Sequence, residues 1–257
     1  MSGAPTVATF DPAAPTRTDA VPLVCFPYAG GDSRAYRSWS GLLPAGLSVH
    51  PARLPGRERR WDEPVPALLT DLAMTVAADV SIAFPGRYVL FGHSMGALLA
   101  FEVARVLSRL DRPPAALVVS GCPPPGSVAR TRRFTGLTDE ELGEWLRTGG
   151  GVPAEVLADP ALRAYVLPIV RADLKLFEGY RYQPRTPLTC PVVYYGATPD
   201  GTPDERVVAG WREQTSGPFE TRTFAGNHFW FTDCPELFAA DLAGRVDRLV
   251  GPINRDM

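Results

Sequence analysis

Residues 88–107 read Tyr88-Val-Leu-Phe-Gly-His-Ser-Met-Gly-Ala-Leu-Leu-Ala-Phe-Glu-Val-Ala-Arg-Val-Leu107. An apolar run typical of a buried strand ends at Gly92, and apolar positions recur at helical spacing from Met95 onward. Between them, Gly92-His-Ser-Met-Gly96 matches the G-x-S-x-G pattern of a nucleophile elbow in the strand-to-helix context that it requires. The glycines allow a sharp turn without a steric clash. The pattern therefore predicts Ser94 as an exposed nucleophile.

The chain has 257 residues, enough for one large α/β domain with a buried core. Its net charge of -2 gives no basic footprint for nucleic acid, and the absence of an 18-residue apolar run argues against a transmembrane helix. Residues 1–20 are rich in Ala, Pro, Thr and Asp and lack the apolar core of a signal peptide. We therefore expect a disordered tail over 1–20 and the folded domain over 21–257.

Four cysteines lie far apart in the sequence and match no metal-ligand spacing. They are Cys25, Cys122, Cys190 and Cys234. The first three lie in or beside apolar runs, so we expect buried free thiols rather than disulfides. This pattern favours a reducing, cytoplasmic location.

Strand-like runs alternate with helix-like stretches along most of the chain. We expect strands over 21–26, 47–52, 88–91, 115–120, 191–196 and 219–224. Helices are expected over 36–43, 65–83, 204–215 and 235–249, and directly after the elbow. This alternation predicts an α/β fold with a mostly parallel sheet covered by helices on both faces.

About seventy residues separate the strands expected at 115–120 and 191–196, far more than a connection in such a fold needs. Pro-rich stretches open and close this insertion, which covers about 123–187. We expect that its helices cannot bury their apolar faces on one another alone, and that they pack over the C-terminal edge of the sheet. The insertion is thus a candidate lid and pocket wall.

Two helices inside the insertion have clear start signals. Thr138 and Glu141 form a capping box, and Asp159-Pro160 begins a longer helix. The aromatic residues that would line a pocket, or simply pack within the insertion, include Trp145 and Phe177.

A serine nucleophile needs a base, and the chain has three histidines. His50 lies in an expected strand and is interpreted as a structural histidine. His93 adjoins Ser94, so its side chain should point away from the nucleophile and serve packing. His228 follows the last expected strand, where the chain order Ser…Asp…His places the base, so we expect His228 in that role.

The acid that orients the base should lie after the strand at 191–196. The candidates are Asp200, Asp204 and Glu205. Asp204 and Glu205 stand where a helix should begin, and acidic residues there commonly interact with the helix dipole. Asp200 follows the strand end directly and is favoured over Asp204. Asp233 comes after the base and breaks the chain order.

An oxyanion needs two backbone N–H donors. One should be Met95, the residue after the nucleophile. The other should come from residues 28–31, Tyr-Ala-Gly-Gly, which we call the oxyanion loop. Ala29 is favoured, with Gly30 as the alternative.

Several motifs together carry a family resemblance over residues 20–250. They are Phe26-Pro-Tyr-Ala-Gly-Gly, Leu54-Pro-Gly-Arg-Glu-Arg, Gly92-His-Ser-Met-Gly, Leu137-Thr-Asp-Glu-Glu-Leu, Leu167-Pro-Ile-Val-Arg-Ala-Asp and Gly226-Asn-His-Phe-Trp. In this combination the chain resembles type II thioesterases, the stand-alone editing α/β-hydrolases of polyketide and non-ribosomal peptide pathways. In that family an Asp commonly lies eleven residues before a Trp that follows the acid strand, and Trp211 points in this way to Asp200.

The resemblance implies an α/β-hydrolase fold with a helical lid and hydrolysis of acyl thioesters on the phosphopantetheine arm of acyl or peptidyl carrier proteins. Ser94, His228 and Asp200 would form the catalytic triad, with Ala29 and Met95 as backbone donors to the oxyanion. No metal or redox cofactor is implied, and we expect a monomer. Two alternatives remain: a generic carboxylesterase or lipase of the same fold, and a non-catalytic homologue that only binds a carrier protein.

Two local groups of arginines lie near the expected site. They comprise Arg53, Arg57, Arg59 and Arg60, and Arg130, Arg132 and Arg133. They could dock an acidic carrier protein or its phosphate. They could equally be solvated loop charges balanced by Glu58, Asp62 and Glu63, and the sequence favours neither interpretation.

Overall fold

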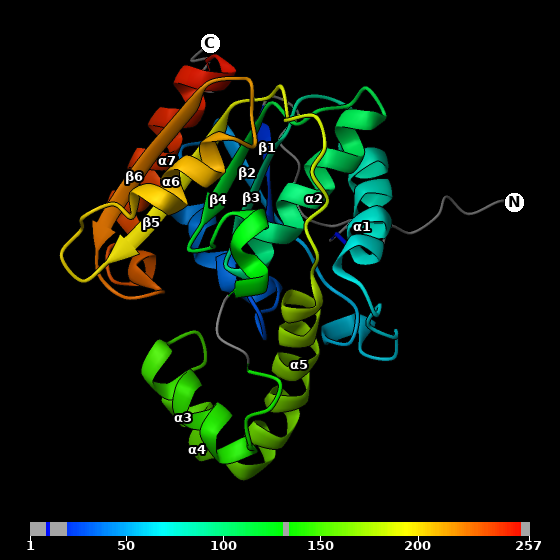
Figure 1. The fold of residues 1–257 in the computed structure, drawn as a ribbon, viewed down its shortest axis with the longest axis vertical. Coiled ribbons are helices and arrows are strands. Elements are labelled where there is room, and N and C mark those ends of the chain that lie inside the picture. Colours follow the sequence, from blue (N-terminus) through cyan, green and yellow to red (C-terminus); the bar gives the residue numbers. More distant parts are fainter. Residues whose placement is uncertain (1–8, 11–19, 131–133, 253–257) are drawn as a thin grey trace, which may run out of the picture.

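The computed structural model describes residues 9–10, 20–130 and 134–252, and six parallel strands form its sheet (Figure 1). The order across the sheet is β2-β1-β3-β4-β5-β6. The strands are β1 (Val21–Phe26), β2 (Leu47–Pro51), β3 (Val89–His93), β4 (Ala116–Ser120), β5 (Val192–Thr198) and β6 (Phe219–Ala225). Their bounds lie within two residues of those expected, which confirms the parallel α/β architecture.

Helices connect the strands. The α-helices are α1 (Leu69–Ala83), α2 (Met95–Arg109), α3 (Asp139–Gly149), α4 (Ala154–Ala158), α5 (Pro160–Gly179), α6 (Glu205–Arg212) and α7 (Pro235–Val250). Short 3-10 helices are η1 (Ser33–Gly41), η2 (Glu58–Arg60), η3 (Pro125–Arg130) and η4 (Trp230–Thr232). The helix expected from residue 65 begins only at Leu69, after Leu68 in extended backbone. Pro66 accounts for the exclusion of Val65, because proline disfavours helical backbone in the residue before it. The short α4 was not expected.

Successive strand residues point to two separate apolar cores, one on each face of the sheet. Leu90 joins the core that is covered by α1, α2 and α6, whereas Phe91 joins the core under η1 and α7. Both faces are thus buried, which explains why β3 and β4 are buried along their whole length.

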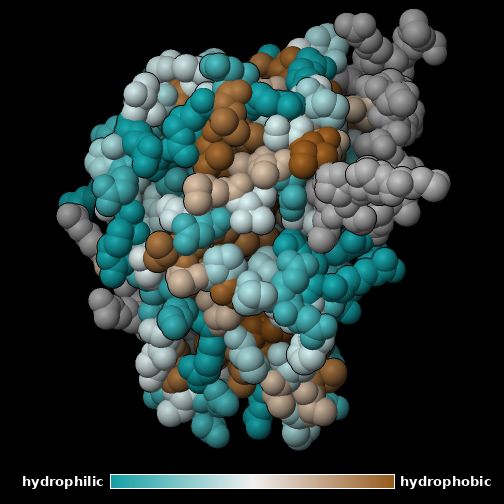
Figure 2. Space-filling model, turned by 90° about the vertical axis from the view of Figure 1, so that its right-hand side faces the viewer, coloured by the Kyte–Doolittle hydropathy of each residue, from teal (hydrophilic) through white to brown (hydrophobic). Residues whose placement is uncertain are grey.

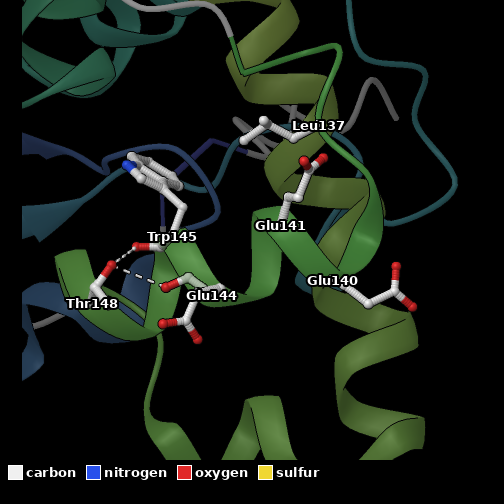
Figure 3. A pocket seen from close by; sticks show the side chains of 6 residues that line it. All are labelled: Leu137, Glu140, Glu141, Glu144, Trp145 and Thr148. Atoms are coloured by element: carbon white, nitrogen blue, oxygen red, sulfur yellow. Dashed lines mark hydrogen bonds between the residues drawn. The ribbon is translucent and has the colours of Figure 1, made fainter.

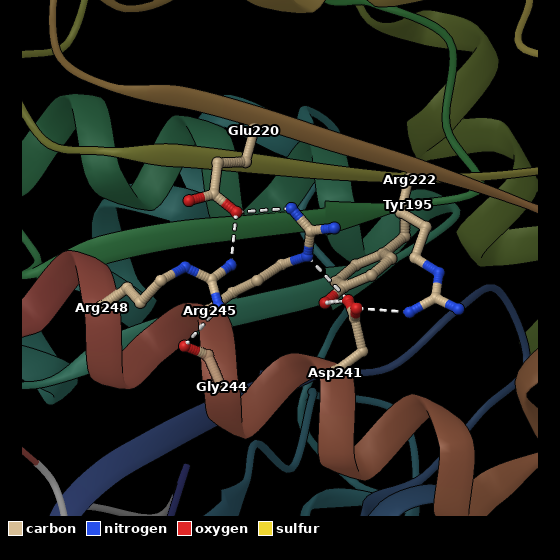
Figure 4. Close-up of polar contacts among 7 residues, drawn as sticks. All are labelled: Tyr195, Glu220, Arg222, Asp241, Gly244, Arg245 and Arg248. Carbon is tan, nitrogen blue, oxygen red and sulfur yellow. Dashed lines mark hydrogen bonds and ion pairs between the residues drawn. The ribbon is translucent and has the colours of Figure 1, made fainter.

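A polar network holds α7 against β5 and β6 (Figure 4). Asp241 of α7 accepts hydrogen bonds from Tyr195 Oη at 2.7 Å and Arg245 Nε at 2.7 Å, and it also pairs with Arg222. Glu220 of β6 pairs with Arg245 and with Arg248 at 3.0 Å. The network anchors the elements on either side of the loop that carries His228.

The helices of the insertion lie beyond one end of the sheet, with α3 and α4 farthest from it (Figure 1). We expected that these helices could not bury their apolar faces on one another alone, but they share a core of their own. That core includes Leu142 and Leu146 of α3, Leu157 of α4 and Leu167 of α5. Three helices provide enough apolar surface to enclose this cluster. The C-terminal part of α5, including Leu176, instead packs into the main core.

Two residues of the tail predicted to be disordered are buried against the domain. The ring of Phe10 lies 5.0 Å from that of Phe84, and Thr9 Oγ1 accepts a hydrogen bond from Arg60 Nη1 at 2.8 Å. These contacts give the two residues a fixed place that composition alone did not indicate. Residues 1–8 and 11–19 of the predicted tail lie outside the described part of the chain.

On the face that carries α1, apolar side chains are interspersed with hydrophilic ones (Figure 2). Met74 and Ile82 of α1 are among the exposed large apolar residues. Within 9–10, 20–130 and 134–252, no helix combines the length and apolar character needed to cross a membrane.

Candidate active site

Ser94 occupies a sharp turn between β3 and α2. Its backbone has φ 54° and ψ −123°, a conformation that non-glycine residues rarely adopt. A Cβ at Gly92 would lie 2.0 Å from Gly96 O, and one at Gly96 would lie 2.2 Å from Phe26 O. Both positions therefore require glycine, and the turn has the strained geometry that the G-x-S-x-G pattern predicts.

A cavity of about 300 Å³ brings together four of the predicted site residues. Ser94, His228, Ala29 and Met95 all line it. The insertion contributes further lining residues, including Trp145, Leu174 and Phe177. The cavity thus lies between the C-terminal edge of the sheet and the insertion, and its wall is largely apolar.

The ring of His228 packs against other aromatic rings. Its centroid lies 4.6 Å from that of His93 and 5.0 Å from that of Phe229. Desolvation lowers the pKa of His228 to about 4, although part of the residue remains exposed. The imidazole is therefore neutral at pH 7, which is the form that can accept a proton from a serine.

The other two histidines have structural surroundings. His93 is fully buried, and its Nδ1 lies 3.1 Å from Ser120 Oγ at the end of β4. Burial, with a smaller effect of His228, lowers the pKa of His93 well below its usual value. His50 Nε2 lies 3.0 Å from Ser48 Oγ, and the His50 ring packs edge-on against Phe84. These contacts agree with the packing roles expected for both.

Asp200 is not among the residues that line the cavity. Its exposed carboxylate accepts hydrogen bonds from Thr202 N at 3.0 Å and Thr198 Oγ1 at 3.2 Å. These bonds, first of all that from the Thr202 backbone, lower the pKa of Asp200. Within the described part of the chain, no hydrogen bond links the His228 ring to a carboxylate. The loops of Asp200 and His228 are nevertheless neighbours, because Thr198 O accepts a bond from Gly226 N at 2.9 Å.

The alternative acids have other positions. Asp204 is the N-cap of α6, and its Oδ1 accepts bonds from Arg206 N at 3.0 Å and Val207 N at 3.3 Å. Glu205 is the first residue of that helix, as expected from the sequence, and Asp233 ends η4. Local hydrogen bonds engage both carboxylates, so the preference for Asp200 rests on its place directly after the end of β5.

In the oxyanion loop, the N–H groups of Gly30 and Gly31 are already engaged, that of Gly31 by Tyr28 O at 2.8 Å. Gly30 N donates to Asp173 Oδ2 at 2.8 Å. Among the described residues, the N–H groups of Ala29 and Met95 have no hydrogen-bond partner. The geometry therefore favours Ala29 over Gly30 as the second donor.

Two of the arginines considered for docking are buried. Arg57 forms an ion pair with Asp173, and Arg60 pairs with Glu63 at 2.6 Å. The buried carboxylate of Asp173 neutralises Arg57, so the interpretation of Arg57 as a docking or solvated charge is wrong. Arg60 is balanced by the exposed Glu63, as the second interpretation expected, although the Arg60 side chain itself is buried rather than solvated. Arg59 is exposed. Arg132 and Arg133 of the second group lie outside the described residues.

The role of Asp173 was not found from the sequence. Its partner Arg57 lies 116 positions away, and no spacing rule links the two. The available signal was indirect: each belongs to one of the motifs that carry the family resemblance, Leu54–Arg59 and Leu167–Asp173.

A second hollow, of about 500 Å³, lies along α3 (Figure 3). It is lined by Glu140, Glu141 and Glu144, but two of these carboxylates already have partners. Glu141 closes the capping box with Thr138, and Glu144 pairs with Arg147. The lining contains neither the serine nor the histidine that the predicted chemistry requires.

The chain is similar to known thioesterases. A thioesterase domain model matches residues 21–240. The thioesterase PikA5 of Streptomyces venezuelae is 37% identical over 85% of this chain and 78% of its own length. The gramicidin S biosynthesis protein GrsT of Aneurinibacillus migulanus is 34% identical over 81% of this chain and 82% of its own length.

The chain is also similar to solved structures of thioesterases. RedJ, a thioesterase from the prodiginine pathway of Streptomyces coelicolor, is 39% identical with a TM-score of 0.81, over 91% of this chain and 96% of its own. The type II thioesterase BorB from the borrelidin cluster is 32% identical with a TM-score of 0.80, over 95% of this chain and 100% of its own. The resemblance found in the motifs is confirmed. The chain therefore belongs to the thioesterase family, as a thioester hydrolase of the type II group with the α/β-hydrolase fold.

Proposed function

We propose that this protein hydrolyses acyl thioesters carried on the phosphopantetheine arm of acyl or peptidyl carrier proteins. In this role it removes aberrant or stalled acyl groups during polyketide or non-ribosomal peptide biosynthesis. The observation that carries the proposal is the common cavity of Ser94 and His228, with an apolar wall suited to an acyl chain. The relatives from the gramicidin S, prodiginine and borrelidin pathways support the choice of substrate.

In the proposed mechanism, Ser94 Oγ attacks the thioester carbonyl while His228 accepts the serine proton. The N–H groups of Ala29 and Met95 stabilise the oxyanion. The C–S bond then breaks, and the pantetheine sulfur leaves as a thiol with the proton from His228. A water molecule, deprotonated by His228, hydrolyses the acyl-Ser94 ester and releases the carboxylic acid. The reaction as proposed uses no metal or redox cofactor.

Asp200 is the proposed acid that orients the His228 imidazole. The neighbouring loops support this role, since Thr198 and Ala225 are partners in the β5–β6 register. The Asp200 carboxylate would have to exchange its bonds from Thr202 and Thr198 for a bond to His228. The Asp200 side chain is exposed, and both bonds that it would exchange come from residues two positions away in the chain.

We further propose that the protein acts as a cytoplasmic monomer on carrier proteins presented by a separate synthase. The four cysteines are free thiols, as expected in a reducing compartment. The insertion would act as the lid over the cavity, since Trp145 and Phe177 from α3 and α5 contribute to the cavity wall.

The test is the intact mass of an acylated carrier protein after incubation with the wild type and with Ser94→Ala. We expect the wild type to release the acyl group and restore free phosphopantetheine, and the variant to leave the carrier acylated. Cleavage of simple oxyesters without deacylation of any carrier would instead support a generic esterase. Binding of carrier protein with no hydrolysis of either substrate would support the non-catalytic alternative.

A further inference from the structure

A buried ion pair connects the insertion to the body of the domain. Arg57 lies between β2 and α1, and Asp173 lies on α5. Arg57 Nη2 contacts Asp173 Oδ1 at 2.5 Å, and Arg57 Nη1 contacts Asp173 Oδ2 at 2.8 Å. Only 2% of the Arg57 side chain and 1% of that of Asp173 is exposed. This bidentate geometry fixes the relative orientation of the two side chains.

The same two side chains hold the oxyanion loop. Asp173 Oδ2 accepts a hydrogen bond from Gly30 N at 2.8 Å, and Arg57 Nη1 donates to Gly31 O at 2.8 Å. The loop closes on itself through a bond from Gly31 N to Tyr28 O, also at 2.8 Å. The N–H of Gly30 and the carbonyl of Gly31 are therefore bonded to the ion pair, and the N–H of Gly31 is bonded within the loop.

Close packing against α5 accompanies these bonds. A Cβ at Gly30, where φ is +79°, would lie 2.4 Å from Val170 Cγ2. Val170 precedes Asp173 by one helical turn, so α5 contacts the loop through both its apolar and its charged side chains. Ala29 packs against the same apolar cluster as Val170.

We propose that Arg57 and Asp173 are positioning residues that hold the Ala29 N–H where the oxyanion forms. Through Asp173, the position of this N–H depends on the position of α5. The inference rests on the proposed function, because it concerns the oxyanion of that reaction. Engaging Gly30 N leaves Ala29 N–H as the available donor beside Ser94. Displacement of α5 would move the Asp173 carboxylate and with it the oxyanion loop. The oxyanion hole would therefore be formed only when α5 of the insertion is packed in its present position.

The test compares Asp173→Asn with a matched control, Glu102→Gln. Glu102 forms another buried ion pair, with Arg105 at 2.7 Å, and it accepts a bond from Tyr180 Oη at the end of α5. It therefore also joins α5 to the body of the domain, but neither Glu102 nor Tyr180 lines the cavity. Removing one partner of a buried pair destabilises a protein, so both variants should lower the Tm.

Four quantities distinguish a loss of oxyanion positioning from a loss of stability alone. They are kcat and KM for deacylation, the affinity for an alkyl boronic acid, and the affinity for an acyl-pantetheine amide. The boronic acid forms a tetrahedral adduct with the serine and needs the oxyanion hole, whereas the amide resembles the bound substrate. We expect Asp173→Asn to lower kcat and boronic acid affinity in parallel, by about 100-fold, as loss of one oxyanion donor does. KM and amide affinity should stay within about threefold, and Glu102→Gln should leave all these values unchanged.

Equal losses of boronic acid and amide affinity, or equal losses in the control, would overturn the proposal, as would an unchanged kcat in a folded Asp173→Asn. Should that variant fail to fold, Arg57→Met/Asp173→Leu removes both charges and gives the same comparison. A wild type that does not deacylate the carrier would contradict the proposed function itself. Because the boronic acid binds without a carrier protein, its affinity still tests the positioning role when no carrier is deacylated, and the two failures are distinguishable.

Discussion

The oxyanion loop and the loop of Asp200 both follow strands at the same edge of the sheet, but they are held differently. Residues 28–31 are clamped by the buried Arg57–Asp173 pair and packed against Val170. Residues 199–204, which we call the acid loop, are held by local bonds such as that from Thr202 N to Asp200. The first loop is preorganised by tertiary contacts from two distant segments. The second depends on bonds between residues two to four positions apart.

This difference matters because the two loops have different proposed tasks. Donors to an oxyanion are effective when their positions do not change during the reaction. An acid that orients a histidine has to reach the imidazole, and the Asp200 carboxylate must first release its local bonds to do so. The comparison thus predicts a rigid donor on one side of the cavity and an adjustable acid on the other.

The largest expected effect comes from the acid loop. Asp200→Asn should lower kcat by roughly 10³–10⁴-fold, because the amide favours the wrong histidine tautomer. The control is Asp204→Ala, which removes the cap of α6 and should cost about 1 kcal/mol of stability while kcat is retained. Steady-state kinetics on an acylated carrier, with thermal unfolding of each variant, measures both. If Asp204→Ala lost activity and Asp200→Asn did not, the assignment of the acid would have to be exchanged.

A smaller effect on kcat is expected when the packing of the oxyanion loop against Val170 is disturbed. Gly30→Ala places a methyl group 2.4 Å from Val170 Cγ2 at a backbone φ of +79°. The loop must shift, and we expect kcat to fall by about 100-fold, with a loss of stability of about 1–3 kcal/mol. Adding Val170→Ala should relieve the clash and recover part of kcat, as single-turnover kinetics would show. An unchanged kcat in Gly30→Ala would mean that the loop position does not govern catalysis.

The smallest expected effect is a shift in pH dependence. Desolvation lowers the pKa of His228 to about 4 in the present geometry, in which Asp200 does not contact the ring. A carboxylate that approaches the imidazole favours its protonated form and raises its pKa by about 1–3 pH units. Because the neutral ring is the active base, the acid limb of kcat/KM should lie above pH 4 in the wild type and move toward about 4 in Asp200→Asn.

The kcat/KM profile of both proteins between pH 3.5 and 8 measures this shift. A wild-type limb near pH 4 that Asp200→Asn leaves in place would show that Asp200 never reaches His228. In that case the acid loop would be a structural turn, and the contrast between the two loops would lose its catalytic meaning.

The parts of the fold that could be predicted depend on local pattern. The six strands, the elbow, the capping box at Thr138 and the N-terminal Pro of α5 each follow from residues close together in the chain. The short α4 was missed because five residues give too little periodicity to recognise. The separate core of the insertion was also missed, since no local pattern shows whether three helices pack on one another or on a sheet.

The sequence by itself determined the strained turn at Ser94, the succession of strands and helices along the chain, and the family resemblance. Residues close together in the chain encode all of these. Only the tertiary structure decided that Arg57 and Arg60 are buried, that Thr9 and Phe10 pack against the domain, and that Gly30 N is engaged by Asp173. Each of these depends on partners from distant segments, such as Arg57 and Asp173, 116 positions apart. Burial and pairing of charges are properties of the assembled fold, since a low-dielectric interior exists only after the segments have packed together.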